Sequence, residues 1–195
     1  YLKNNGAHAY DVNGDGWVDV ISGDWHGDEI VWFQNPGEVG LAKGLLWKRH
    51  VLKKTRGQNE AMFLRDLDGD NVPEIVVDCW QAEAPVVAWK FSQSEKGPTL
   101  TRHELGTHGC GHGMAFGDVT ADGRDDILTQ VGWYECPAEN PLEHEWKHHA
   151  SWNRPHGSCP FLVVDLTGDG RNDVIWGNGH DYGLYWLEQL DTAGD

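Results

Sequence analysis

The residues with the clearest chemical potential are carboxylates repeated in four nine-residue segments, at residues 11–19, 66–74, 118–126 and 165–173. Each segment has an acidic residue at its first, fifth and ninth positions, and an apolar run follows each one. Carboxylates at such spacing in a tight turn direct their oxygens into one hollow. A hard cation that takes six to eight oxygen ligands suits this hollow, and calcium is the usual choice. We therefore expect calcium at these segments, up to four ions in the chain.

Two simpler structures could carry the same residues. An EF-hand loop needs a glutamate at its twelfth position and a helix on either side. The twelfth residues here are Ser22, Val77, Thr129 and Trp176, and β-branched runs flank the segments, so we reject the EF-hand. A plain Asp/Gly turn is the other interpretation. Four copies, each followed by an apolar strand, favour calcium binding over it.

The composition limits the partners. The formal net charge is −16, and a basic footprint for phosphate is missing, so we expect no nucleic-acid partner. No apolar run is long enough for a membrane span. The four cysteines show neither zinc-like pair spacing nor a dense disulfide framework. The chain begins at Tyr1, which implies a processed or excised segment, and open calcium sites favour an extracellular or periplasmic location.

The segments recur in phase with other landmarks, with a period of about 50 residues. A short apolar strand precedes each segment, a second follows it, and a third carries aromatic residues. Four short antiparallel strands per repeat are typical of propeller blades. We predict an all-β fold: a β-propeller of four-stranded antiparallel blades, with about four blades in a single propeller segment. The repeats are expected at approximately residues 1–52, 53–105, 106–151 and 152–195.

A fourth strand ends in a basic residue and a histidine in the first three repeats, at His50, His103 and His149. We interpret these histidines, like the aromatic residues of the third strands, as blade packing. The fourth repeat stops before its own fourth strand. The chain is therefore either a four-bladed ring or, as we favour, part of a larger ring with further blades or domains.

The motif D-x-[ND]-x-D-G-x-x-[DE], followed by an apolar strand, resembles the FG-GAP/VCBS repeat family, the blade type also found in integrin α-subunits. The resemblance covers nearly all of the chain. It implies a propeller, usually seven-bladed, with calcium in the loop between the first and second strands of each blade. Carried over by position, it implies as calcium ligands Asp11, Asn13, Asp15, Asp19, Asp66, Asp68, Asp70, Glu74, Asp118, Asp122, Asp126, Asp165, Asp169 and Asp173.

Three residues depart from the family pattern. Thr120 and Thr167 replace the usual third-position Asp or Asn, so the third and fourth sites have fewer charged ligands and are expected to bind more weakly. Asn71 replaces the sixth-position glycine, and asparagine tolerates a positive φ better than most residues. Some relatives carry the propeller beside sugar-modifying domains, as in aldos-2-ulose dehydratase, which favours a carbohydrate ligand.

The face opposite the calcium segments collects histidines and aromatic residues. Expected near the axis are Asn5, Glu60, His112 and Cys159, with His8, His108 and His156 nearby; the loops between second and third strands add Trp25, His26, Trp80, Gln81, His180 and Asp181. The corresponding loop of the third repeat is short, which would leave a notch beside the glycine-rich segment 108–113, where backbone could approach a ligand. The simplest interpretation is a wet channel lined by polar groups.

Two sharper hypotheses apply to this face. Trp25 and Trp80 could stack on a sugar ring. The imidazoles of His112 and His156, with Glu60, could instead catalyse proton transfer, or such groups could hold zinc or another transition metal. We expect a calcium-stabilised binding or scaffold module of a secreted protein, with carbohydrate as the ligand. The alternatives are a sugar lyase or dehydratase, and a propeller that binds another protein; enzymatic activity of this segment alone is left open.

Overall fold

The structure is a computed structural model. It describes residues 6–23, 25–57, 59–81, 83–107, 109, 111–153, 157 and 161–190. Of the residues expected on the His-rich face, Asn5, His108, His156 and Cys159 lie outside this description. No helix in the described part is long and apolar enough to cross a membrane.

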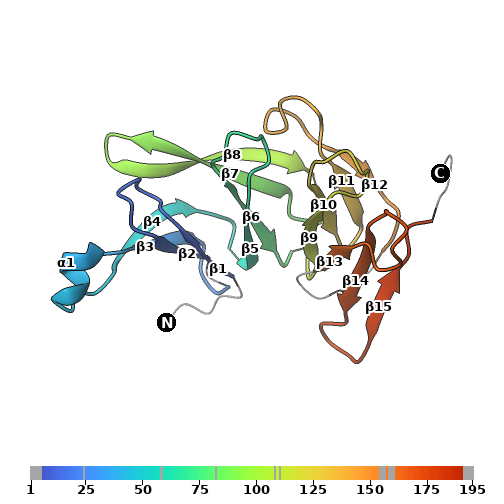
Figure 1. Cartoon of the computed structure of the whole chain (residues 1–195), viewed down its shortest axis with the longest axis horizontal. Coiled ribbons are helices and arrows are strands. Elements are labelled where there is room, and N and C mark those ends of the chain that lie inside the picture. The colour runs from blue at the N-terminus through green and yellow to red at the C-terminus, as the bar shows by residue number, and fades with distance from the viewer. Residues whose placement is uncertain are drawn as a thin grey trace. The chain divides into compact units, whose positions relative to one another are not determined.

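The strands form four small antiparallel sheets in which neighbours in the chain are neighbours in space (Figure 1). The first sheet contains β1 (Ala7–Tyr10), β2 (Asp19–Gly23), β3 (Glu29–Gln34) and β4 (Lys48–Lys54). The second contains β5 (Asn59–Arg65), β6 (Glu74–Cys79), β7 (Val86–Ser94) and β8 (Gly97–Gly106). The third contains β9 (Met114–Gly117), β10 (Asp126–Thr129), β11 (Gly132–Glu135) and β12 (Lys147–His149). The fourth contains β13 (Leu162–Val164), β14 (Asp173–Gly177) and β15 (Leu184–Leu187).

These sheets confirm the predicted fold class, an all-β propeller with four blades present. The fourth sheet has three strands among the described residues, as expected from a repeat that stops before its fourth strand. A short helix, α1 (Gly37–Ala42), follows β3 and was not predicted. Membership of a seven-bladed ring stays a prediction.

Strand pairing places every acidic segment at the same corner of its sheet. The first two strands of each sheet are antiparallel, and the ninth residue of the segment pairs with the last residue of the first strand. These pairs are Tyr10 with Asp19, Arg65 with Glu74, Gly117 with Asp126, and Val164 with Asp173. Each segment is therefore the loop between the first and second strands, as the family resemblance implies.

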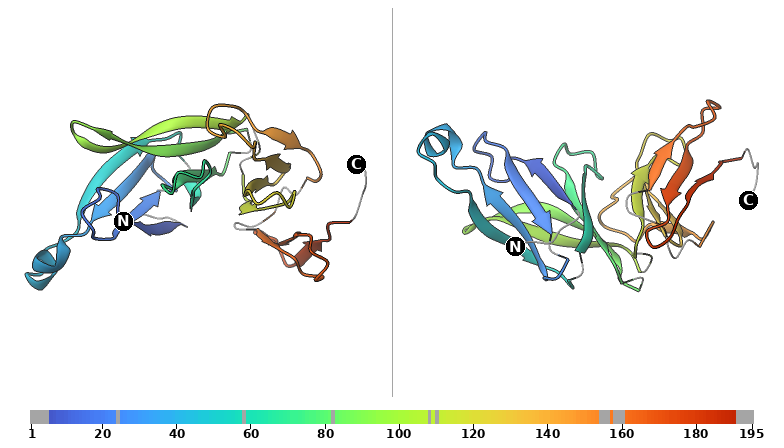
Figure 2. Two further views of the ribbon diagram at one scale, coloured as in Figure 1. Left: turned by 45° about the horizontal axis from the view of Figure 1, so that its top comes forward. Right: turned by 90° about the horizontal axis from the view of Figure 1, so that it is seen from below.

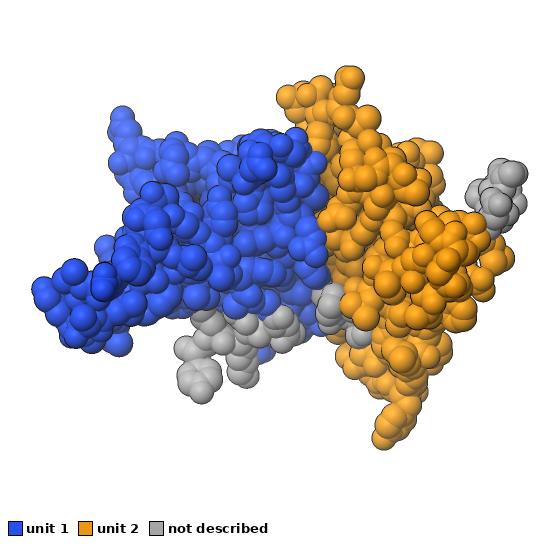
Figure 3. Space-filling model, viewed as in Figure 1, with its two compact units in different colours: residues 1–79, 87–103 blue, residues 80–86, 104–195 orange. Residues whose placement is uncertain are grey.

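The chain divides into two compact units (Figure 3). The first comprises residues 1–79 and 87–103, and the second comprises residues 80–86 and 104–195. Figure 2 shows the ribbon from two further directions. In the first unit β1 and β2 contact β5, and in the second β9 contacts β13, so each unit contains contacts between successive sheets.

Each unit has a core built from alternating strand residues. The core of the first unit includes Ile21, Trp32, Ile75 and Trp89, all of them buried. The core of the second includes Ala115, Leu128, Trp133, Phe161, Val174 and Trp176. Burying an aliphatic or aromatic side chain of this size contributes about 1.5–3 kcal/mol, so Trp32, Trp89 and Trp133 of the third strands are a main source of stability in the first three sheets, whereas Tyr185 and Trp186 of the fourth sheet are exposed.

The recurring histidines of the fourth strands pack in the same way. The ring of His50 stacks on Trp32 with centroids 4.6 Å apart, and that of His149 stacks on Trp133 at 4.0 Å. Both pairs are directly opposite each other in neighbouring strands. Burial lowers the pKa of His50 below its ordinary value, which favours the neutral ring. The interpretation of these two histidines as blade packing is confirmed.

Candidate metal loops and the opposite face

The first aspartate of each segment folds the loop around its own carboxylate. Oδ1 of Asp11 accepts hydrogen bonds from the backbone N–H groups of Gly14 (2.9 Å) and Asp15 (3.1 Å), and Oδ2 accepts one from Gly16 (2.8 Å). Asp165 accepts the same three bonds, and Asp66 and Asp118 each accept two of them. The loop is thus shaped by its own backbone donors, and the carboxylate oxygens keep lone pairs for a cation.

The turn needs two residues in the left-handed region. The fourth and sixth positions have positive φ in every segment, and six of these eight residues are glycines. The exceptions are Asn71 (φ 67°) and Ala121 (φ 60°). Asn71 behaves as the sequence predicted. Ala121 is an unexpected departure, because an alanine in this region costs roughly 1–2 kcal/mol relative to its preferred conformations.

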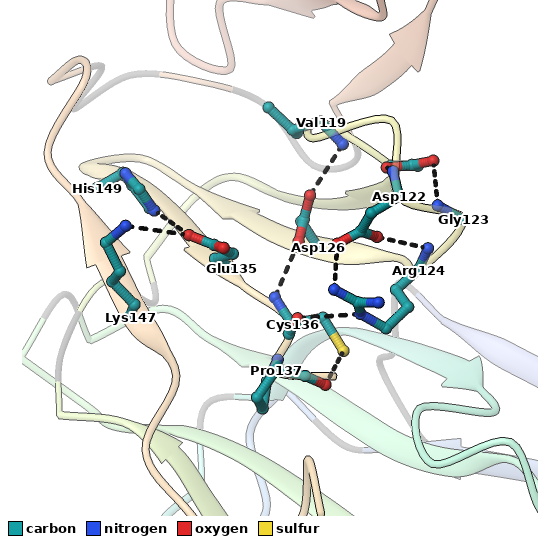
Figure 4. Close-up of polar contacts among 11 residues, drawn as sticks. Val119, Asp122, Gly123, Arg124, Asp126, Glu135, Cys136, Pro137, Lys147 and His149 are labelled. Carbon is teal, nitrogen blue, oxygen red and sulfur yellow. Dashed lines mark hydrogen bonds and ion pairs between the residues drawn. The ribbon is translucent and has the colours of Figure 1, made fainter. Parts of the chain in front are cut away.

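The ninth carboxylate ties the loop to the third strand. Oδ2 of Asp19 accepts the N–H of Val12 (3.1 Å), and Oδ1 accepts the N–H of Asn35 (2.7 Å), which follows β3. Asp126 and Asp173 make the same two bonds, and Figure 4 shows those of Asp126 to Val119 and Cys136. These side chains are buried, and burial raises the pKa of Asp19 and Asp126.

The second segment differs because its ninth residue is a glutamate. Oε2 of Glu74 accepts the N–H of Leu67 at 2.9 Å, but the buried Oε1 accepts no hydrogen bond from the described residues. Carboxylate oxygens of Asp66, Asp68 and Glu74 lie within 4.8 Å of one another. Burial, followed by repulsion from Asp68, raises the pKa of Glu74 to about 7, although the Leu67 N–H opposes the rise.

This donor set fits a hard cation. Three convergent carboxylates, one of them with a buried oxygen that accepts no hydrogen bond from described residues, supply the oxygen ligands that calcium takes. In the other segments the first, fifth and ninth carboxylates lie on the same folded loop. The full set of fourteen predicted ligand residues stays a prediction.

Basic side chains contact three of the four loops. In the third segment the Arg124 guanidinium contacts Asp122 and also donates from Nε to the carbonyl of Cys136 (3.2 Å; Figure 4). Arg171 makes the equivalent contacts with Asp169 and Gln189. The second loop is contacted instead by Lys90, from β7. Sequence reasoning missed all three, although arginine at the seventh position of two segments was a visible signal.

Three side chains of the predicted opposite face come together in the second unit. The indole Nε1 of Trp80 lies 2.5 Å from Nε2 of His112, and Nε2 of His180 lies 2.8 Å from the same atom. Because an indole N–H only donates, Nε2 of His112 is the acceptor. Trp80 is 43% exposed, and His180 is also exposed. We call this group the Trp–His cluster.

The strand directions place the cluster away from the loops of the same unit. His112 precedes β9 and His180 follows β14, whereas the acidic segments join the other ends of these strands. The connection between β10 and β11 is a tight turn at Gln130 and Val131, as the short loop predicted. A Cβ added to Gly111, at φ 131°, would lie 2.7 Å from the Gln130 side chain. This glycine therefore serves close packing against the protein's own turn.

The remaining predicted residues are placed separately. Trp25 and His26 are in the first unit, where their rings meet edge to face with centroids 6.4 Å apart. Glu60 is also in the first unit, at a bulge of β5. His8, on β1, bonds through Nε2 to the carbonyl of Met62 at 2.5 Å. Asp181 is exposed next to His180, and its Oδ1 accepts the N–H of Tyr182 at 2.7 Å.

Comparison with known families gives one finding. A family model described as an FG-GAP-like repeat matches residues 11–77, a range that includes the first two acidic segments. A search of curated proteins finds no match to the chain.

Proposed function

Residues 11–77 are an FG-GAP-like repeat, and from this premise we propose that the chain is a calcium-stabilised FG-GAP/VCBS-type propeller. It acts as a binding or scaffold module of a secreted protein, in an extracellular or periplasmic setting. Carbohydrate is the proposed ligand class. Calcium would be held by carboxylates of the acidic loops, where it would neutralise their mutual repulsion and fix the corner of the sheet to which it binds.

The observation that carries the ligand proposal is the Trp–His cluster. Trp80 offers an exposed indole, and His180 offers an exposed imidazole beside His112. A sugar ring has apolar C–H faces that pack on an aromatic ring, while its hydroxyls need donors and acceptors at the edge. An indole beside two imidazoles supplies both kinds of contact.

A glycan array followed by calorimetry on two tryptophan variants tests this proposal. Trp80→Ala should lose affinity for the bound glycan by roughly tenfold or more, about 1.4 kcal/mol. The matched control is Trp47→Ala, which removes a comparably exposed tryptophan from the first unit. Equal binding by both variants, or no binding to any glycan, would contradict the proposed ligand site.

A second candidate function rests on the same imidazoles. The contact between His112 and His180 is the kind of arrangement that can relay a proton, as a sugar lyase or dehydratase requires. Imidazole nitrogens also suit zinc, so a transition metal belongs to this alternative. Elemental analysis together with turnover assays on His112→Ala decides it. If the unmodified chain has a bound metal or a turnover that His112→Ala loses while it stays folded, the result favours the enzyme. If the unmodified chain has neither a bound transition metal nor turnover, the enzyme hypothesis is rejected.

A further inference from the structure

Lys90 reaches into the second acidic loop from the third strand of the same sheet. Its Nζ donates to Oδ2 of Asp68 and, at 2.6 Å, to Oδ2 of Asp70, and it lies 3.7 Å from Oε1 of Glu74. The ammonium thus contacts carboxylates from the third, fifth and ninth positions together. These are positions at which a calcium ion would find its ligands.

The strand register brings Lys90 to this place. The tenth residue of each segment pairs with a residue of the third strand: Val20 with Phe33, Ile75 with Trp89, Ile127 with Tyr134, and Val174 with Leu187. The residues that follow these partners are Gln34, Lys90, Glu135 and Glu188. Only the second sheet has a cation at this position, beside the only glutamate at a ninth position.

The second loop places carboxylates where their mutual repulsion calls for a cation. The second segment is the one with a carboxylate at its third position, Asp68, in addition to those at the first, fifth and ninth positions; the fourth carboxylate of the third segment, Asp125, is instead at the eighth position. Three carboxylates of the second segment have oxygens within 4.8 Å of one another. Carboxylates at such distances repel each other strongly in a partly buried site unless a cation lies among them. The Lys90 ammonium donates hydrogen bonds to Asp68 and Asp70 and forms an ion pair with Glu74 at 3.7 Å, so its charge lies beside three of the four carboxylates.

The arginines of the third and fourth loops do not have this role. Arg124 and Arg171 each contact the fifth carboxylate, two residues before them, and donate from Nε to the carbonyl of a residue that follows the third strand, Cys136 or Gln189. They therefore link the edge of the loop to the backbone after the third strand. In the first segment the fifth carboxylate accepts the Asn13 amide instead, at 2.8 Å.

We propose that the Lys90 ammonium is the resident cation of the second segment, so that this loop is held closed without calcium while the other three segments bind it. The chain then takes up one calcium ion fewer than its four acidic segments suggest. The proposal rests on the proposed calcium binding of the other segments. It also makes the second repeat the part of the chain whose stability does not depend on calcium.

Calcium stoichiometry of matched variants tests it, with elemental analysis after dialysis and calorimetric titration as independent readouts. Asp165→Asn should bind one calcium fewer than the unmodified chain, whereas Asp66→Asn, the same change in the second segment, should bind the same number. Lys90→Gln should bind one more. Lys96→Gln, which removes an exposed lysine beyond the end of β7, is the control and should leave the stoichiometry unchanged.

The possible failures are distinguishable. If Asp66→Asn and Asp165→Asn each lose one calcium, the second segment binds calcium and the role of Lys90 is overturned, while the proposed function stands. If neither the unmodified chain nor Lys90→Gln binds calcium, both proposals fall. If Lys90→Gln does not fold without calcium, the two aspartate variants still decide the question in the presence of Lys90.

Discussion

At the scale of single residues, Ala121 is the residue that best shows that the loops require a positive φ at their fourth position. It occupies the fourth position of the third segment at φ 60°, where the other segments have Gly14, Gly69 and Gly168. A Cβ added at Gly168 meets no atom within 4 Å, so at this position the backbone conformation alone decides the energy.

Exchanging the two residue types should therefore have opposite effects. Ala121→Gly is expected to raise the free energy of unfolding by about 0.5–1 kcal/mol, since the relief of strain exceeds the entropy that glycine adds to the unfolded chain. Gly168→Ala should lower it by roughly 1 kcal/mol. Urea denaturation at saturating calcium measures both. A destabilised Ala121→Gly would show that the alanine side chain makes a contact of its own.

At the scale of elements, the ninth carboxylate joins a loop to two strands. Asp126 binds the N–H of Val119 in the loop and of Cys136 after β11, both at 2.9 Å. Because the carboxylate is buried, its removal leaves buried donors without acceptors, which costs about 1–3 kcal/mol for each donor.

Asp126→Ala should therefore destabilise the chain even without calcium. In excess chelator the free energy of unfolding is expected to fall by about 2–6 kcal/mol. The neighbouring, exposed Asp125→Ala is the control and should stay within about 0.5 kcal/mol. If Asp126→Ala had an effect only when calcium is present, the residue would act as a ligand and not as a tie between strands.

The third sheet also contains a pH-dependent contact between β11 and β12. Glu135 accepts hydrogen bonds from His149 (2.7 Å) and Lys147 (3.3 Å), shown in Figure 4. The His149 bond, with help from Lys147, holds the pKa of Glu135 below its ordinary value. A carboxylate with a lowered folded-state pKa stabilises the fold above its unfolded pKa, and this contribution is lost as the pH falls through the folded-state value.

The expected result is a difference between variants below about pH 4.5, the ordinary glutamate range. Stability of the unmodified chain should fall more steeply there than that of Glu135→Gln, whereas Glu188→Gln, at an exposed position of the fourth repeat, should follow the unmodified chain. Thermal denaturation at a series of pH values, with calcium held constant, measures the slopes. Parallel slopes for the chain and Glu135→Gln would rule out a stabilising role for this contact.

At the scale of the whole molecule, the net charge of −16 makes the chain's stability depend on cations. Removing calcium should lower the melting temperature, because a ligand that binds only the folded state adds about 2.7 kcal/mol per site at a hundred times its dissociation constant. Calorimetry with chelator and after calcium is restored checks this. Magnesium at equal concentration is the control. Any divalent cation screens the negative charge of the chain and would raise the melting temperature without occupying a specific site. Equal effects of both ions would contradict specific calcium sites.

Much of the fold was determined by the sequence alone. The acidic segments, the strands on either side of them and the aromatic third strands are all local patterns, and their repetition in phase excludes accidental matches. Strand pairing between neighbours in the chain follows from short connections, so the blade could be predicted from residues close together in sequence. The same reasoning missed α1, because a single turn-rich insertion has no periodic signal.

The tertiary structure decided which separated residues meet. Lys90 follows the second segment by 16 residues, and only the register of β6 and β7 brings its ammonium among the loop carboxylates. Trp80, His112 and His180 were each expected on one face, but they follow or precede strands of three different sheets, so their meeting at hydrogen-bonding distance depends on contacts between residues far apart in the sequence. Residue types and spacing thus determined which chemistry the loops could hold. Long-range packing decided that the Lys90 ammonium lies among the carboxylates of the second loop. The reason is that contact distances between separated strands are set by the folded sheet and not by the local pattern.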